Sequence, residues 1–180
     1  MKPCHGFAVV LMVVLTLAGV PCFGASDEAP VWKDASPPAD LADIAIESLD
    51  GTTRHLSDYR GKVVLLSFWA TWCAPCILEL PTLMEAQAAL GAESIAVLAV
   101  SEDRGGRGEV EKFASRHPEL AAILTYIDPG RRAGKALGIG AVPTTILIDR
   151  QGRELGRLIG GTDWCSPEMR DRMVAARAAP

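Results

Sequence analysis

The segment Ser67-Phe-Trp-Ala-Thr-Trp-Cys-Ala-Pro-Cys76 decides how this chain of 180 residues is interpreted. It overlaps the apolar run Val63–Trp69, which is typical of a central strand buried on both faces of a sheet. A helix is predicted from near Cys73 to about Leu90, because apolar residues recur there at spacings of three, four and seven. The two cysteines therefore lie where a buried strand passes into a helix.

Two cysteines three positions apart can close a small disulfide ring. Cys73 is predicted at the helix N-terminus, where free backbone amides and the helix dipole stabilise a thiolate. Cys76 lies one turn further along and is less exposed. Cys73 is therefore predicted to be the nucleophile and Cys76 the thiol that resolves a mixed disulfide. Ala74 and Pro75 lie between them and are candidate substrate contacts, and Pro75 stiffens the turn.

Other uses of a cysteine pair must be weighed. Covalent haem attachment needs a histidine at position 77, where the chain has Ile77. A zinc site needs two further ligands, and the candidates Cys165, His55 and His117 are widely scattered, so no metal site is predicted. Two thiolates alone can hold Cu(I). A copper-binding metallochaperone or assembly factor therefore stays open as the alternative function.

The rest of the chain alternates strands and helices. A β-hairpin is predicted around Asp50-Gly51, and the short turn at Asp149 requires antiparallel neighbours. Further strands are predicted at 95–100, 124–127, 144–148 and 154–159, and further helices at 109–117, at 131–137 and from Pro167 onward. This alternation predicts an α/β fold with a mixed central sheet flanked by helices.

Composition limits the class of protein. The chain is 49% hydrophobic and 22% charged, which is typical of a folded globular protein. Its net charge of −4 includes no basic excess, so a nucleic-acid partner is not expected.

The N-terminal segment has the pattern of an export signal. Lys2 precedes the apolar run Phe7–Val20, and small residues follow Pro21. Residues 1–24 are therefore predicted to be a signal peptide or a membrane anchor. The Pro-, Ala- and Asp-rich residues 25–40 are predicted to form a flexible linker, and residues 41–180 the folded domain. The expected location is the periplasm, where thiols meet oxidants.

Several motifs resemble those of a known family. The segment 67–76 resembles the active-site segment of thioredoxin-like proteins, and Val142-Pro143-Thr144 resembles their cis-proline segment. Residues 56–62 and 161–164 are similar to the exported TlpA/ResA/CcmG-like branch, and 102–128 resembles the helix–strand insert of that branch. The resemblance implies a thioredoxin-like fold and a thiol-disulfide oxidoreductase without a cofactor.

The resemblance also implies roles for single residues. Pro143 is expected to be cis and to present the backbone of Val142 to a substrate cysteine. Trp72 is expected to shield the nucleophile and contact substrate. Glu79 matches the acid of the ResA-like branch. It lies three residues after Cys76 on the packed helix face, so burial should raise its pKa and let it take the Cys76 proton.

The implied partners are protein disulfides, such as those of apocytochrome c or of a copper-site assembly protein. Electrons are expected from a membrane-embedded dithiol donor, because no nicotinamide or flavin motif is present. Ala70 occupies the place where a peroxidase would have a threonine. Cys165 departs from the family pattern: chain topology allows it near the active-site rim, but we expect a free, buried and inert thiol beside Trp164.

Overall fold

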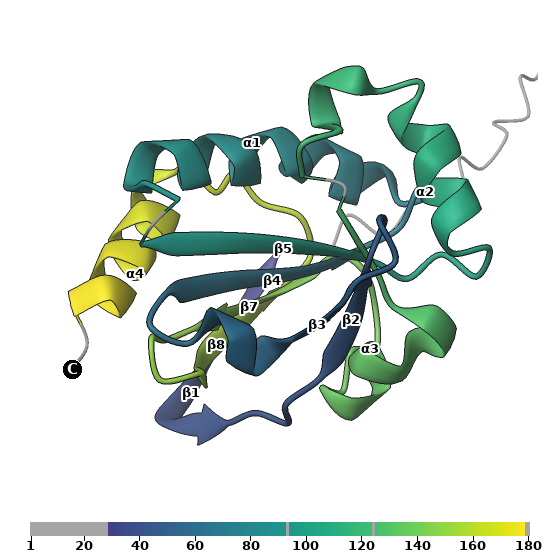
Figure 1. Cartoon of the computed structure of the whole chain (residues 1–180). Coiled ribbons are helices and arrows are strands. Elements are labelled where there is room, and N and C mark those ends of the chain that lie inside the picture. The colour runs from purple at the N-terminus through teal and green to yellow at the C-terminus, as the bar shows by residue number, and fades with distance from the viewer. Residues whose placement is uncertain (1–28, 93, 124, 179–180) are drawn as a thin grey trace, which may run out of the picture.

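Strand β4 (Val63–Trp69) runs through the middle of an eight-stranded sheet (Figure 1). The computed structural model describes residues 29–92, 94–123 and 125–178. The strand order is β1-β8-β7-β4-β5-β6-β2-β3. Strand β4 pairs parallel with β5 and antiparallel with β7, so the sheet is mixed as predicted.

Except for the first strand, the β-strands and α-helices follow the predicted order, with boundaries shifted by a few residues. The strands beside β4 are β1 (Val31–Asp40), β2 (Ala45–Ser48), β3 (Thr53–His55), β5 (Ile95–Ser101), β6 (Tyr126–Ile127), β7 (Thr144–Ile148) and β8 (Arg153–Ile159). The α-helices are α1 (Ala74–Leu90), α2 (Arg107–Ala114), α3 (Arg132–Ala136) and α4 (Pro167–Ala178), and three short 3₁₀ helices are η1 (Leu56–Tyr59), η2 (Pro118–Leu120) and η3 (Pro129–Arg131).

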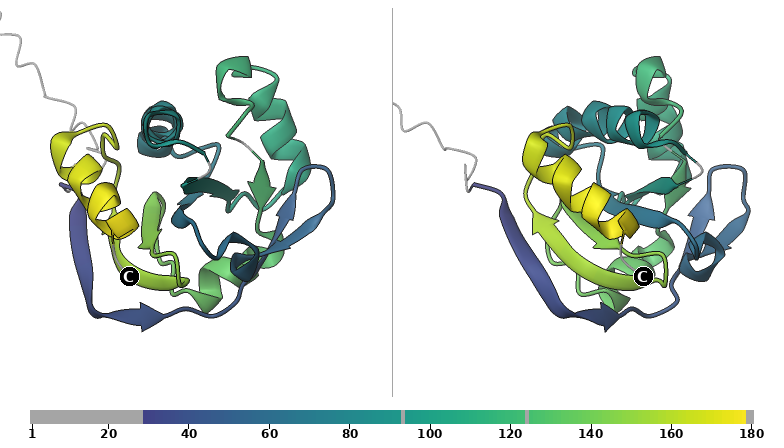
Figure 2. Two further views of the ribbon diagram at one scale, coloured as in Figure 1. Left: turned by 60° about the vertical axis from the view of Figure 1, so that its left-hand side comes forward. Right: turned by 90° about the vertical axis from the view of Figure 1, so that its left-hand side faces the viewer.

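Both faces of the sheet are covered, which explains why β4 is an unbroken apolar run. Because successive side chains of a strand point to opposite faces, β4 contributes to two cores. Val63, Leu65 and Trp69 join the core beneath α1, α2 and α4. Val64, Leu66 and Phe68 join the core that α3 covers on the other face. The two layers of helices are visible in Figure 2.

Helix α1 begins directly after Cys73, which is its N-cap residue. The predicted apolar face is confirmed, since Cys76, Leu80 and Leu83 are fully buried in the core above β4. The helix is continuous through Pro81 as far as Leu90. The strand-to-helix junction thus fixes the cysteine pair at one end of the sheet.

The predicted linker is wrong for residues 31–40, which form the edge strand β1. This strand pairs antiparallel with β8, with Val31 opposite Ile159 and Asp40 opposite Arg153. An edge strand needs hydrogen bonds on one side only, so it tolerates the prolines that suggested a linker. The Trp32 ring is packed against the core and covered by the Arg172 guanidinium, 4.2 Å from the ring centroid.

The predicted signal peptide or anchor, residues 1–24, lies outside the described residues. Within the residues that are described, no helix has both the length and the apolar character that crossing a bilayer requires.

Candidate active site

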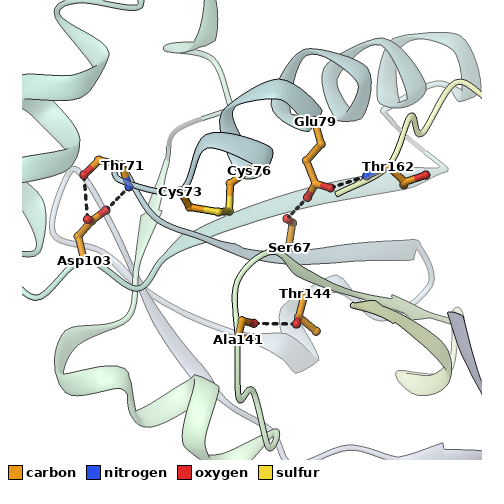
Figure 3. The surroundings of a disulfide bond; sticks show 9 residues. All are labelled: Ser67, Thr71, Cys73, Cys76, Glu79, Asp103, Ala141, Thr144 and Thr162. Atoms are coloured by element: carbon orange, nitrogen blue, oxygen red, sulfur yellow. Dashed lines mark hydrogen bonds between the residues drawn. A yellow bond between two sulfur atoms is a disulfide. The ribbon is translucent and has the colours of Figure 1, made fainter. Parts of the chain in front are cut away.

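Cys73 and Cys76 form a disulfide at the N-terminus of α1, with their Cα atoms 5.3 Å apart (Figure 3). The Ile77 N–H donates to the Cys73 carbonyl at 3.1 Å, which begins the helix. Cys76 is completely buried, and Cys73 is 4% exposed. Cys73 is thus the more accessible of the two, as predicted, although in the oxidised protein both are largely covered.

Glu79 is a buried acid one turn beyond Cys76 on the same helix. Its side chain is 2% exposed, as the sequence predicted. The Ser67 hydroxyl donates to Oε1 at 3.3 Å, and the Thr162 backbone N–H donates to Oε2 at 3.2 Å (Figure 3). Burial raises the pKa of Glu79 to about 7, against the opposing effect of these hydrogen bonds. The carboxyl group can therefore take up or release a proton near neutral pH.

The segment before β7 contains the expected cis peptide bond between Val142 and Pro143. The Thr144 hydroxyl donates to the Ala141 carbonyl at 2.8 Å, and the Gly160 N–H donates to the Pro143 carbonyl at 3.0 Å. These contacts hold the turn to the end of β8.

Two pockets flank the strand-to-helix junction. The Glu79 pocket, of about 290 Å³, is lined by Pro75, Leu78, Glu79, Thr82, Gly161, Thr162 and Asp163. The Trp72 pocket, of about 540 Å³, is lined by Trp72, Glu102, Arg104, Glu109, Arg131, Gly140, Ala141 and Val142. Ala74 and Pro75 are exposed between the cysteines. Trp72 and Leu78, at 72% and 78% exposed, are large apolar side chains facing solvent beside the cysteine pair.

Two buried acids in this region were not predicted from the sequence. Glu102 and Asp103 directly follow β5 and are 4% and 5% exposed. Arg131 donates a hydrogen bond to Glu102, and burial raises the pKa of Glu102 in spite of that contact. Their position directly after a buried strand could have indicated them, because the carboxyl ends of neighbouring parallel strands meet at one edge of a sheet. The ends of β4 and β5 are such a pair.

Cys165 is a free thiol as expected, but it is only partly buried, so the expectation of a buried thiol is wrong. Its Sγ lies 3.5 Å from the Thr82 carbonyl and 3.5 Å from a Glu85 carboxylate oxygen. Thr82 is six residues beyond Cys76, or roughly 9 Å along the axis of α1. The structure therefore places Cys165 against the flank of α1 and not beside the disulfide. Partial desolvation, followed by the Glu85 contact, raises the pKa of this thiol.

The sequence matches a known protein family and curated thiol-disulfide oxidoreductases. Residues 37–153 match the model of the AhpC/TSA family. The chain belongs to this family. It is 38% identical over 120 residues to the thiol-disulfide oxidoreductase ResA of Geobacillus thermodenitrificans, covering 67% of each chain. It is 31% identical over 159 residues to ResA of Oceanobacillus iheyensis, covering 86% of this chain and 79% of that one.

Solved structures give the same result. A crystal structure of a putative thiol:disulfide interchange protein DsbE from Chlorobium tepidum superposes with a TM-score of 0.69 at 31% identity. The match covers 78% of this chain and 96% of that chain. The thioredoxin-like fold and the thiol-disulfide oxidoreductase activity expected from the sequence motifs are thus confirmed for this AhpC/TSA family member.

Proposed function

We propose that this oxidoreductase is an exported reductant of protein disulfides that serves cytochrome c maturation or the assembly of a copper site. One observation supports the proposal: the Cys73–Cys76 disulfide lies at the N-terminus of α1, and the buried Glu79 lies one turn beyond Cys76. That arrangement supplies a nucleophile, a resolving thiol and a proton acceptor along one helix. The ResA names of the relatives support the choice of a thiol-disulfide exchange reaction.

The reaction starts from the reduced protein. The Cys73 thiolate attacks one sulfur of the substrate disulfide and displaces the other sulfur as a thiolate, which takes a proton. The Cys76 thiolate then attacks the Cys73 Sγ and releases the second substrate sulfur. Two electrons pass to the substrate, and the protein is left with the disulfide seen in the structure.

Glu79 provides the base for the second step. Cys76 is fully buried, so bulk water has little access to its proton. A carboxyl group with a pKa of about 7 can accept that proton at neutral pH and return it to solvent afterwards. The Glu79 pocket gives this exchange a route to the surface.

The substrate chain docks on the Trp72 side. Val142, ahead of Pro143, offers its backbone to an extended segment around the substrate cysteine, as one strand adds to another. Trp72 lines the same pocket as Val142 and offers an exposed apolar ring. Ala74 and Pro75, exposed between the cysteines, complete the contact surface.

The oxidised protein must be reduced again after each turnover. We assign that step to a membrane-embedded dithiol donor, which transfers two electrons by the same exchange in reverse. The apolar run at residues 7–20 directs the chain out of the cytoplasm, into the periplasm, as a signal peptide or as an N-terminal membrane tether.

Substrate trapping tests the proposal. A Cys76→Ser variant expressed in the native host should hold partners on Cys73 as mixed disulfides, and mass spectrometry should find exported proteins with paired cysteines. A Cys73→Ser/Cys76→Ser double variant is the matched control and should trap nothing. Tight binding of one Cu(I) per chain by the reduced protein, without trapped disulfide partners, would instead favour the copper-binding metallochaperone.

A further inference from the structure

A second carboxylate holds the segment that leads into the cysteine pair. Asp103, which follows β5, is 5% exposed and accepts two hydrogen bonds from the single residue Thr71 (Figure 3). The Thr71 backbone N–H donates to Oδ2 at 2.9 Å, and the Thr71 hydroxyl donates to Oδ1 at 2.8 Å. Both carboxylate oxygens are therefore bound to a residue two positions before Cys73.

The end of β5 holds this carboxylate in place. The Ser101 hydroxyl donates to Oδ2 of Asp103 at 2.8 Å and accepts from the Asp103 N–H at 3.1 Å. The neighbouring Glu102 N–H donates to the Trp69 carbonyl at 2.8 Å. The end of β4 and the segment after it are thus bonded to the residues that follow β5, at Trp69 and at Thr71.

Among the described residues, no helix cap or salt bridge explains the burial of the Asp103 carboxylate. A buried aspartate after a strand often caps the next helix, but the N-cap of α2 is Gly106, which receives no side-chain cap. Within residues 29–92, 94–123 and 125–178, the Asp103 side chain bonds only to Thr71 and Ser101 and forms no salt bridge.

The residue that these contacts support is Trp72. It is 72% exposed, so packing within the domain does not hold its ring. Its backbone is instead fixed on both sides, because Asp103 binds Thr71 and the Cys73 N–H donates to the Ala70 carbonyl at 3.1 Å. An exposed aromatic ring on a fixed backbone is a preformed contact surface at the edge of the Trp72 pocket.

We propose that Asp103 is a positioning residue that clamps Thr71 and thereby presents Trp72 to the incoming protein substrate. This inference rests on the proposed function, because it assumes that protein disulfides dock on the Trp72 side. A preordered aromatic side chain loses less conformational freedom on association, which strengthens binding. The clamp therefore acts on substrate docking and leaves the thiol chemistry of Cys73 unaltered.

Steady-state reduction of two substrates tests the clamp. For a peptide closed by a Cys-x-x-Cys disulfide, Asp103→Ala should raise KM by about tenfold, with kcat within about twofold of the wild type. Hydroxyethyl disulfide has no peptide segment to dock in the Trp72 pocket, so its rate of reduction should stay within about twofold. Asp103→Asn should restore the peptide KM, because an amide oxygen can accept from the Thr71 N–H while the Thr71 hydroxyl turns to accept from the amide NH₂.

Asp149→Ala is the matched control. Asp149 is 1% exposed and accepts bonds from the Gln151 and Arg153 backbones, but it lies in the turn between β7 and β8. This variant should lose stability and keep its peptide KM. If Asp103→Ala does not fold, Thr71→Val removes one of the two clamp bonds and should raise KM in the same direction.

A measurement that does not depend on catalytic turnover tests the clamp independently of the proposed function. The NMR order parameter of the Trp72 indole N–H should fall in Asp103→Ala and match the wild type in Asp103→Asn. An unchanged order parameter and peptide KM in Asp103→Ala would overturn the clamp, as would equal damage by Asp103→Asn. A wild-type protein that fails to reduce the peptide would overturn the proposed function, while the order parameter still decides on the clamp.

Discussion

Replacing Glu79 by Gln should change how the stability of the oxidised protein depends on pH. An exposed glutamate ionises near 4.5, and burial raises the pKa of Glu79 to about 7. Between these values the folded protein binds more protons than the unfolded chain, so the free energy of unfolding falls as the pH rises. Each pKa unit corresponds to 1.36 kcal/mol, so the free energy of unfolding falls by about 3 kcal/mol over this range. The fall is complete above about pH 7.

Urea unfolding of the wild type and of Glu79→Gln, from about pH 4 to about pH 8, measures this loss. Other titrating groups are common to both proteins and cancel in the difference. The wild type should lose about 3 kcal/mol relative to the variant, which corresponds to a shift of roughly 1–3 M in the urea midpoint. A difference that stays constant across this range would refute the assignment of a buried, protonatable carboxyl group to Glu79.

Three further predictions concern the thiols and the partner of Glu79. In the reduced protein Cys73 should alkylate before Cys76 at neutral pH, because Cys73 is the helix N-cap and the more accessible of the two. Peptide mapping after brief iodoacetamide treatment checks this. Preferential labelling of Cys76 would reverse the roles of nucleophile and resolving thiol. Cys165→Ser should leave turnover within about twofold, and mass spectrometry should find Cys165 as a free thiol in the oxidised wild type, because Cys165 lies beside α1 and its pKa is raised. A disulfide to Cys165 in the peptide map would contradict both. Ser67→Ala removes a hydrogen bond that lowers the pKa of Glu79, so the inflection in the pH–rate profile should move to higher pH, and an inflection at lower pH would count against the contact.

The sequence predicted the parts of the fold that depend on local pattern. The run Val63–Trp69 is buried on both faces, and a strand of that kind must lie in the middle of a covered sheet. The burial of Glu79 also followed from local pattern, because residues three apart share one helix face. The same reasoning placed the cysteine pair at the start of α1, because the apolar run of the strand ends at Trp69 and the helical spacing of apolar residues begins near Cys73.

The contacts that the sequence did not reveal join distant segments. Asp103 binds Thr71 across 32 positions of chain, and Thr162 binds Glu79 across 83. No local sequence pattern indicates either pair, because the partners are far apart in the chain and only the folded arrangement of the strands brings them together. The edge strand β1 was missed for a different reason: most of its residues are exposed, so the alternation that marks a half-buried strand is weak there.

The pairing of β1 with β8 also decides where the chain enters the folded domain. Pro30 lies against Gly160, so closely that a Cβ at Gly160 would come within 3.1 Å of the Pro30 Cα. The adjacent Gly161 approaches Pro75 in the same way, at 3.2 Å. Whatever precedes Pro30 is therefore attached at the end of the domain that carries the disulfide.

The other terminus leaves from the opposite end. Arg177, in the last turn of α4, shares a pocket with Gly61 and Ser94, which come just before β4 and β5. A label or fusion partner after α4 thus leaves the reactive end of the domain open, whereas one placed before β1 stands beside it. For a chain held at a surface by its N-terminus, the same polarity turns the dithiol toward that surface.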